Sequence, residues 1–216
     1  MAHSLRKMDV YLEIGKKRTF AGAIDWPGWC RSGRDEAAAL QALFDYGPRY
    51  ARVLRAARLG FRAPTDTVVF AVIERLQGNA TTDFGAPDAV PTSDRRPVDD
   101  AELRRFQTLL NACWRAFDAT TSAATGKVLR QGPRGGGRDL ERIVQHVLGA
   151  DEGYLGRLGW KFEMDEADEP GRKLSQARKA MLDALAPAVR GEMSTRGPRG
   201  GVRWTPHYFV RRVARA

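Results

Sequence analysis

The spacing of apolar residues changes part-way along the chain, and this change restricts the folds that the chain can adopt. Val10, Leu12 and Ile14 recur at every second position, which is the period of a β-strand. From about residue 98 onwards, apolar residues recur at every third or fourth position, which is the period of an amphipathic helix. A chain of 216 residues is long enough to bury a sizeable core. We therefore predict an α+β fold with two domains.

Residues 1–78 are predicted to form a small α/β domain. Asp35 precedes the Ala-rich run EAAALQALF, which favours a helix that begins there. Gly47-Pro48 is expected to interrupt this helix before YARVLRAARLG continues it. The strands are expected at residues 10–14, 19–24, 29–31 and 67–76.

The segment that follows, residues 79–97, reads NATTDFGAPDAVPTSDRRP. It contains three prolines and many residues that favour turns. We interpret it as the linker between the two domains.

Residues 98–216 are predicted to form a bundle of four helices, the last of them short. Four amphipathic stretches support this prediction; their first apolar residues are Leu103, Leu140, Leu174 and Tyr208. An up-down-up-down order of the helices is expected, because this is the simplest connection of a four-helix bundle.

The pentapeptide GPRGG occurs twice, at residues 132–136 and 197–201. In an up-down-up-down bundle, these two connections lie at the same end. That end would gather the basic residues Lys127, Arg130, Arg134, Arg138, Arg196, Arg199 and Arg203. The opposite end would gather the acidic residues Asp99, Asp100, Glu163, Asp165, Glu166, Asp168 and Glu169.

The predicted basic end suits an anionic partner. Helix N-termini, glycine loops and arginine side chains together can bind phosphate or carboxylate. The net charge is +10, and it is uneven: residues 101–216 hold 21 basic and 13 acidic residues, against 15 and 13 in residues 1–100. Nucleic acid is the favoured partner, because the arginines are many and spread. Ordinary loop glycines with solvated arginines, and a protein partner, are the alternatives.

The helical half resembles the DinB-like bundle superfamily over about residues 98–216. The stretches that carry the resemblance are GRDLERIVQHVLGADEGYLGRLGW (137–160) and RWTPHYFVRRVA (203–214). The resemblance implies a divalent metal held by three histidines and, in some members, thiol-dependent transferase activity. His146 matches the first ligand, but the last helix offers only His207, at its start. We expect these two histidines to differ by roughly 10 Å in height, too far for one metal ion.

The first half resembles the HicB-like antitoxin fold over about residues 9–76. The stretch PGWCRSGRDEAAALQAL (27–43) carries this resemblance. It implies a fold similar to a partial double-stranded-RNA-binding domain, which in antitoxins contacts a toxin. Trp26 and Trp29 flank Pro27-Gly28, and we expect them to pack in the core or the turn rather than to stack on bases.

These observations favour a non-catalytic binding protein without a cofactor. A metal- and thiol-dependent transferase that uses His146 is the first alternative, and a protein–protein assembly module, including a homo-oligomer, is the second. The sequence has no run of about 18 apolar residues and no signal-peptide pattern, so no membrane association and a cytoplasmic location are expected. Cys30 and Cys113 are expected to be reduced thiols.

Overall fold

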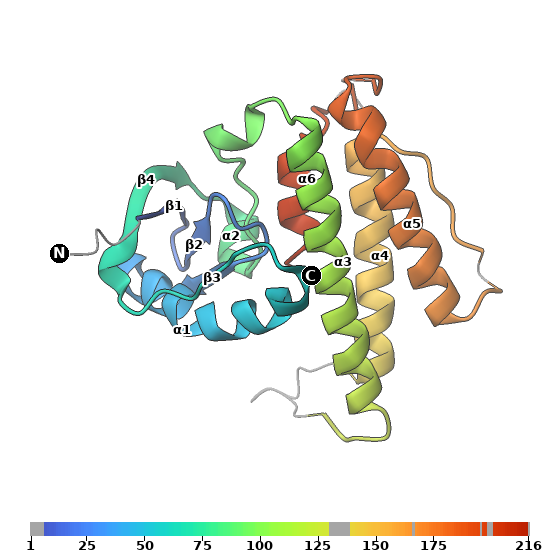
Figure 1. The fold of residues 1–216 in the computed structure, drawn as a ribbon, viewed down its shortest axis with the longest axis horizontal. Helices are drawn as coiled ribbons and strands as arrows, with labels where there is room; N and C mark the ends of the chain where they lie inside the picture. Colours follow the sequence, from blue (N-terminus) through green and yellow to red (C-terminus); the bar gives the residue numbers. More distant parts are fainter. Residues whose placement is uncertain (1–6, 130–138, 166, 195, 198–200, 216) are drawn as a thin grey trace. The chain divides into compact units, whose positions relative to one another are not determined.

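The protein consists of a four-stranded sheet followed by several helices (Figure 1). The computed structural model describes residues 7–129, 139–165, 167–194, 196–197 and 201–215. The chain divides into two compact units. Unit 1 extends to Arg96 and also includes Val210–Arg215, whereas unit 2 is Pro97–Phe209. No helix within the described ranges is long and apolar enough to cross a membrane.

The sheet of unit 1 has the strand order β3-β2-β1-β4. β1 pairs antiparallel with β2 and parallel with β4. The parallel pair forms because helix α1 (Glu36–Leu54) lies between β3 and β4 in the chain and provides the crossover. The strands predicted from the sequence are all present, with these bounds: β1 Met8–Ile14, β2 Thr19–Ala23, β3 Cys30–Gly33 and β4 Phe70–Gln77.

Helix α1 begins where the sequence predicts, and the expected interruption at Gly47-Pro48 is wrong. The Asp35 carboxylate accepts a hydrogen bond of 2.8 Å from a backbone amide of the first turn. Pro48 lies inside a continuous helix. It lacks an N–H and so removes one intrahelical hydrogen bond, but contacts beyond it hold the helix together. The Tyr50 hydroxyl donates to the Pro27 carbonyl at 2.8 Å, and both Tyr50 and Leu54 are buried.

An aromatic cluster joins α1 to the sheet. Trp29 is fully buried, and its indole N–H donates to the Leu43 carbonyl at 2.9 Å. Phe61 lies edge-on to Trp29, with ring centroids 5.0 Å apart, and edge-on to Tyr50 at 4.9 Å. Trp29 therefore packs in the core, as the sequence predicts.

The segment expected to be a linker is part of unit 1. It contains the helix α2 (Ala80–Phe84) and a short 3₁₀ helix at Thr92–Arg95. Glu13 on β1 is fully buried. Its carboxylate accepts hydrogen bonds from donors that all lie in this segment: Thr82 Oγ1 at 2.5 Å, Asp88 N at 2.9 Å and Ala89 N at 3.1 Å. A buried carboxylate needs such donors, so the segment packs on the sheet instead of linking two domains.

The prediction of one helical domain over 98–216 is also wrong at its C-terminal end, because residues 210–215 belong to unit 1. Arg211 is buried and forms a bidentate ion pair with buried Asp94, at 2.6 and 2.8 Å. Its guanidinium also donates to the carbonyls of Ala23 and Ile24, at 2.6 and 3.1 Å. Arg215 lies over the Phe20 ring, 4.7 Å from its centroid. These contacts with the sheet and with the 3₁₀ helix Thr92–Arg95 account for the return of the chain to unit 1.

The four predicted helical stretches are present. They are α3 (Asp100–Ala124), α4 (Leu140–Leu158), α5 (Pro170–Val189) and α6 (Pro206–Val213), of which residues 206–209 belong to unit 2. Asp99, Asp139 and Thr205 cap the N-termini of α3, α4 and α6, each with its side chain accepting a backbone N–H. The buried side chains of unit 2 include Phe106, Leu109, Leu110, Leu148, Leu155, Ala177, Met181 and Leu185.

The helices do not follow the expected up-down-up-down order. Arg178 of α5 pairs with Asp118 in the second half of α3. Arg190, at the end of α5, interacts electrostatically with Asp100, at the start of α3. α5 is therefore antiparallel to α3.

The start of α6 identifies the direction of α4. The backbone N–H of Trp204 donates to the carbonyl of Arg157, at the end of α4. His207 Nε2 lies 3.2 Å from Glu102 Oε1, at the start of α3. The end of α4 therefore lies at the start of α3, so α4 and α5 run in the same direction (Figure 1). The connection 159–169 makes this possible, because eleven extended residues span about 36 Å and α4 is only about 28 Å long.

Candidate functional site

The order of the helices separates the basic residues that the sequence predicts to form one end. Lys127 is exposed and follows the end of α3. Arg203 donates to the Gly156 carbonyl, at the end of α4, at 3.0 Å. These positions are opposite ends of unit 2. Arg130, Arg134, Arg138 and Arg199 lie outside the described residues. The up-down-up-down order on which the predicted basic end rests is therefore wrong, and residues 132–136 and 198–200 of the two GPRGG copies lie outside the described residues.

Arg203 holds its own connection in place. Its Nε donates to the Arg196 carbonyl at 2.8 Å, next to an antiparallel bridge between Arg196 and Val202. It also packs on Gly159, which has φ 108°, and a Cβ at Gly159 would lie 2.6 Å from Arg203 Nη1. Arg196 itself is exposed. Of these two residues, Arg203 therefore has a structural role at the end of α4.

The predicted acidic end is not formed either. The connection 159–169, which carries most of those acidic residues, joins the end of α4 to the start of α5, and these lie at opposite ends of unit 2. Asp168 pairs with Arg172 at 3.3 Å, and Asp99 caps α3. The described acidic residues are therefore distributed along the unit, and Glu166 lies outside the described residues.

The histidines do not come together in the described part of the chain. His146 is exposed on α4, whereas His207 is buried beside Glu102 and lies edge-on to Phe106, with ring centroids 5.1 Å apart. Among the described residues, no group of three His, Cys, Asp or Glu side chains is placed to hold a metal ion. The role of His146 as a metal ligand stays a prediction.

Both cysteines are free, and both are held as thiols. Burial raises the pKa of Cys30, and it raises the pKa of Cys113 to about 12. Because the thiolate is the reactive form, neither side chain is activated for nucleophilic attack.

A row of exposed arginines lies on unit 1, outside the basic surface that the sequence predicts. We call it the arginine row: Arg49, Arg52, Arg55, Arg58 and Arg62. The first three lie on the second half of α1 and the 3₁₀ turn Arg55–Ala57 that follows it. None of the five guanidinium groups forms an ion pair or hydrogen bond with another residue of the described chain. Residues 46–65 contain no acidic side chain, so the charge of the row is uncompensated along the chain.

The acidic side chains of α1 do not extend beyond its middle, where Asp45 accepts a hydrogen bond from Gln41. Asp35 and Glu36 are at the N-terminus, and Glu36 pairs with Arg75 at 3.0 Å. This distribution agrees with the helix dipole, which favours anions at the start of a helix and cations at its end. Counting charge over halves of the chain hid the arginine row, because acidic residues elsewhere in residues 1–100 reduce the net charge of that half to +2. The spacing of three residues in RYARVLRAAR is the signal that identifies it.

Arg58 has a backbone conformation that an arginine rarely adopts. Its φ is 52° and its ψ 31°, in the left-handed region, and it is the only non-glycine residue with positive φ among those described. This conformation costs a residue with a Cβ roughly 1 kcal/mol, and glycine is the usual choice at such a helix end. Arg58 therefore places an exposed side chain, without an ion pair or hydrogen bond in the described chain, at a backbone position that favours glycine.

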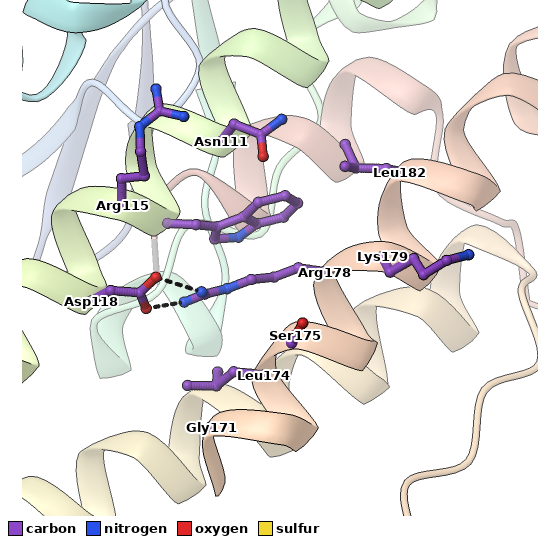
Figure 2. A pocket seen from close by; sticks show the side chains of 10 residues that line it. Asn111, Arg115, Asp118, Gly171, Leu174, Ser175, Arg178, Lys179 and Leu182 are labelled. Carbon is purple, nitrogen blue, oxygen red and sulfur yellow. Dashed lines mark hydrogen bonds and ion pairs between the residues drawn. The ribbon is translucent and has the colours of Figure 1, made fainter.

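Unit 2 has a cleft of about 550 Å³ between α3 and α5 (Figure 2). Its centre is the bidentate ion pair of Arg178 with Asp118, at 2.7 and 2.8 Å. The Arg178 guanidinium carbon lies 5.8 Å from the ring centroid of Trp114. Gly171 and Ser175 keep the α5 side of the cleft open, because neither fills the space opposite α3. The cleft therefore combines an aromatic side chain with an arginine whose two terminal nitrogens donate to Asp118, whereas its buried Nε has no hydrogen-bond partner among the described residues.

Asp151 of α4 is a second acidic neighbour of Arg178. It is only 2% exposed. Burial raises its pKa to about 7, and the positive charge of Arg178 offsets this only in part. Asp151 therefore changes its protonation near neutral pH. No pattern in the sequence distinguishes it from the other acidic residues of the helices.

Comparisons with models of protein families, with curated proteins and with solved structures found no match.

Proposed function

We propose that the protein binds nucleic acid and that the arginine row of unit 1 is the contact surface. The observation that carries the proposal is the row itself: five exposed guanidinium groups in fourteen residues, with no acidic side chain between residues 46 and 65. Arginine contacts to phosphate release counterions from nucleic acid, which is the main source of its sequence-independent affinity. The net charge of +10 adds long-range attraction to any polyanion.

The anionic partner is the one that the composition predicts, but the proposed contact surface lies on unit 1 and not at the GPRGG connections. The residues of the two GPRGG connections that the structure describes lie at opposite ends of unit 2. The residues of the arginine row follow one another in the chain, from the second half of α1 through the 3₁₀ turn to the segment after it. A surface of this kind can contact successive phosphates.

The helix dipole provides a structural reason for some of these arginines, because cations near the end of α1 stabilise it. That contribution is about 0.3–1 kcal/mol for a charge in the last turn. This stabilisation applies to Arg52, in the last turn of α1, and to Arg55, which caps the helix. It does not account for Arg49, Arg58 and Arg62.

A salt series tests the proposal. Binding of the whole protein to a 20-base-pair duplex would be followed by fluorescence anisotropy for the wild type and for the variant Arg49→Gln, Arg52→Gln, Arg55→Gln and Arg58→Gln. We expect the variant to bind at least about tenfold more weakly. The slope of log affinity against log salt should become shallower by about 3.6, at about 0.9 per phosphate contact.

Two matched variants serve as controls, and all three variants lower the net charge from +10 to +6. One replaces the exposed Arg104, Arg115, Arg142 and Arg157 of unit 2 with Gln; we expect its affinity to stay within about twofold of the wild type. The other replaces Arg134, Arg138, Arg196 and Arg199, and spares Arg203 because of its structural contacts. Loss of binding in this variant, with normal binding in the first, would return the site to the GPRGG connections. Absence of binding by the wild type at 50 mM salt, or equal binding to anionic lipid vesicles, would refute the proposal.

A further inference from the structure

We infer that the arginine row recognises the phosphate backbone of a duplex and does not read the bases. This inference rests on the proposed function and specifies its substrate class. It depends on three features of the row: which other side chains accompany the arginines, how the row is supported, and how closely its charges are spaced.

The stretch that carries the row, RYARVLRAARLGFR (49–62), contains no side chain that can form a hydrogen bond to a base edge except arginine and Tyr50. It has no Asn, Gln, Ser, Thr, Asp or Glu, which are the other common base-reading residues. Its only hydroxyl, on Tyr50, is buried and donates to the Pro27 carbonyl. Direct readout would therefore depend on arginine contacts to guanine alone.

The aromatic residues near the row are engaged within unit 1. Tyr50 and Phe61 pack on each other and on Trp29. Tyr46, one turn before the row, lies under Arg31, whose guanidinium carbon is 3.1 Å from the ring centroid. Binding of single strands relies on aromatic faces that stack on the bases. Residues 46–62 therefore provide positive charges for phosphates, but no aromatic face on which a base could stack.

The helical part of the row is supported by packing on the sheet, and the charges of the row are closely spaced. α1 is anchored on the sheet by its buried residues, among them Ala39, Leu43 and Leu54. Arg49 and Arg58 lie about 15 Å apart along the helix axis, from rises of about 1.5 Å per residue in α1 and 2.0 Å in the 3₁₀ turn. A duplex presents one phosphate charge per about 1.7 Å of its axis, or about nine along the row. A single strand has a lower charge density and would lose conformational freedom on alignment with a fixed row.

Arg58 offers a way to separate function from stability. Because its backbone favours glycine, Arg58→Gly should stabilise unit 1 and still weaken binding. A residue with a structural role would show the opposite change in stability. We expect a higher midpoint of thermal unfolding, together with a slope of log affinity against log salt that is shallower by about 0.9 for duplex. A lower unfolding midpoint, or an unchanged slope, would mean that Arg58 is not a contact residue.

The test of the inference compares probes of equal length in the same salt series. The probes are a 20-base-pair DNA duplex, a 20-base-pair RNA duplex, their component single strands, oligo(dT), and a second DNA duplex of unrelated sequence. With four or five contacts, we expect duplex affinity to fall about 150- to 500-fold between 50 and 200 mM salt. Single strands should bind at least about tenfold more weakly than duplexes at 50 mM salt. The two DNA duplexes should bind equally within about twofold.

The outcomes distinguish this inference from the proposed function. Single strands that bind as tightly as duplexes, or a tenfold difference between the two DNA sequences, would overturn the duplex inference and leave nucleic-acid binding standing. No binding to any probe at 50 mM salt would refute both.

Discussion

Glu13 and Asp94 of unit 1 are as deeply buried as Asp151 of unit 2, but their surroundings differ. Glu13 accepts three hydrogen bonds from the segment 82–89, and Asp94 shares two with Arg211. Asp151 has the charge of Arg178 nearby, and its pKa is nevertheless raised to about 7. Unit 1 thus compensates its buried carboxylates with hydrogen-bond donors from distant parts of the chain. Unit 2 instead holds a buried carboxyl group that titrates near pH 7. We expect the two units to respond differently to substitution and to pH.

The largest effect is expected for Arg211→Met. Asp94 would stay buried without its partner, and removing one partner of a buried ion pair costs about 3–5 kcal/mol. Unit-resolved stability can be measured by hydrogen exchange, which we expect to show the loss in unit 1. The control Arg215→Met should cost less than about 1 kcal/mol, because it removes a ring contact and a long hydrogen bond of 3.4 Å. The double variant Asp94→Leu and Arg211→Met should recover much of the loss; if it does not, the ion pair is not the cause.

An intermediate effect is expected from pH on unit 2. The folded state raises the pKa of Asp151 above the model-compound value of 3.8, so the folded state binds the proton more tightly than the unfolded state. The free energy of unfolding should therefore fall as pH rises from about 4 to about 7, and stay low above 7. The loss should be on the order of 2–4 kcal/mol.

The variant Asp151→Asn isolates this effect. It removes the titrating group, so we expect unit 2 to be more stable than the wild type at pH 8, by a margin that becomes smaller at pH 5. Urea unfolding at the two pH values measures both. A wild-type stability of unit 2 that is the same at pH 5 and pH 8 would show that Asp151 has an ordinary pKa and that the two units compensate buried charge alike.

The smallest effect is expected for Lys179→Gln on α5. Lys179 pairs with Asp183 at 2.6 Å, but the two side chains are 76% and 49% exposed. Such a surface pair contributes about 0.3–0.5 kcal/mol. A loss above 1 kcal/mol would contradict this expectation and would mean that exposed ion pairs stabilise unit 2 more than such pairs usually do. Thermal unfolding at low and high salt would measure it, since salt screens exposed pairs.

The elements of both units could be predicted from the sequence, because their signals are local. Alternation of apolar residues identified β1, and capping residues such as Asp35 and Thr205 marked where helices begin. The expected break at Pro48 failed because local propensity was outweighed by packing of the following turn, where Tyr50 bonds to Pro27. Tertiary contacts decide such positions, and a single sequence does not reveal them.

The candidate site was harder to predict, because it depends on direction and on long-range contacts. The α3–α4 and α5–α6 connections lie at one end of unit 2 or at opposite ends, depending on the path of residues 159–169. No local pattern in the sequence shows whether this segment runs the length of the unit or forms a loop at one end. The role of residues 79–97 depends on Glu13, which lies 69 positions before Thr82. The arginine row was an exception: its spacing is visible in the sequence, and counting charge over half the chain concealed it.

The return of residues 210–215 to unit 1 has a consequence for the order in which the protein folds during its synthesis. Val210 follows Arg96 by 114 positions. At about 5–20 residues per second, a ribosome takes roughly 6–23 s to add them. Throughout that interval Asp94 and the carbonyls of Ala23 and Ile24 are without Arg211, while the helices of unit 2 are already being made. The unit that is encoded first is therefore the one that is completed last.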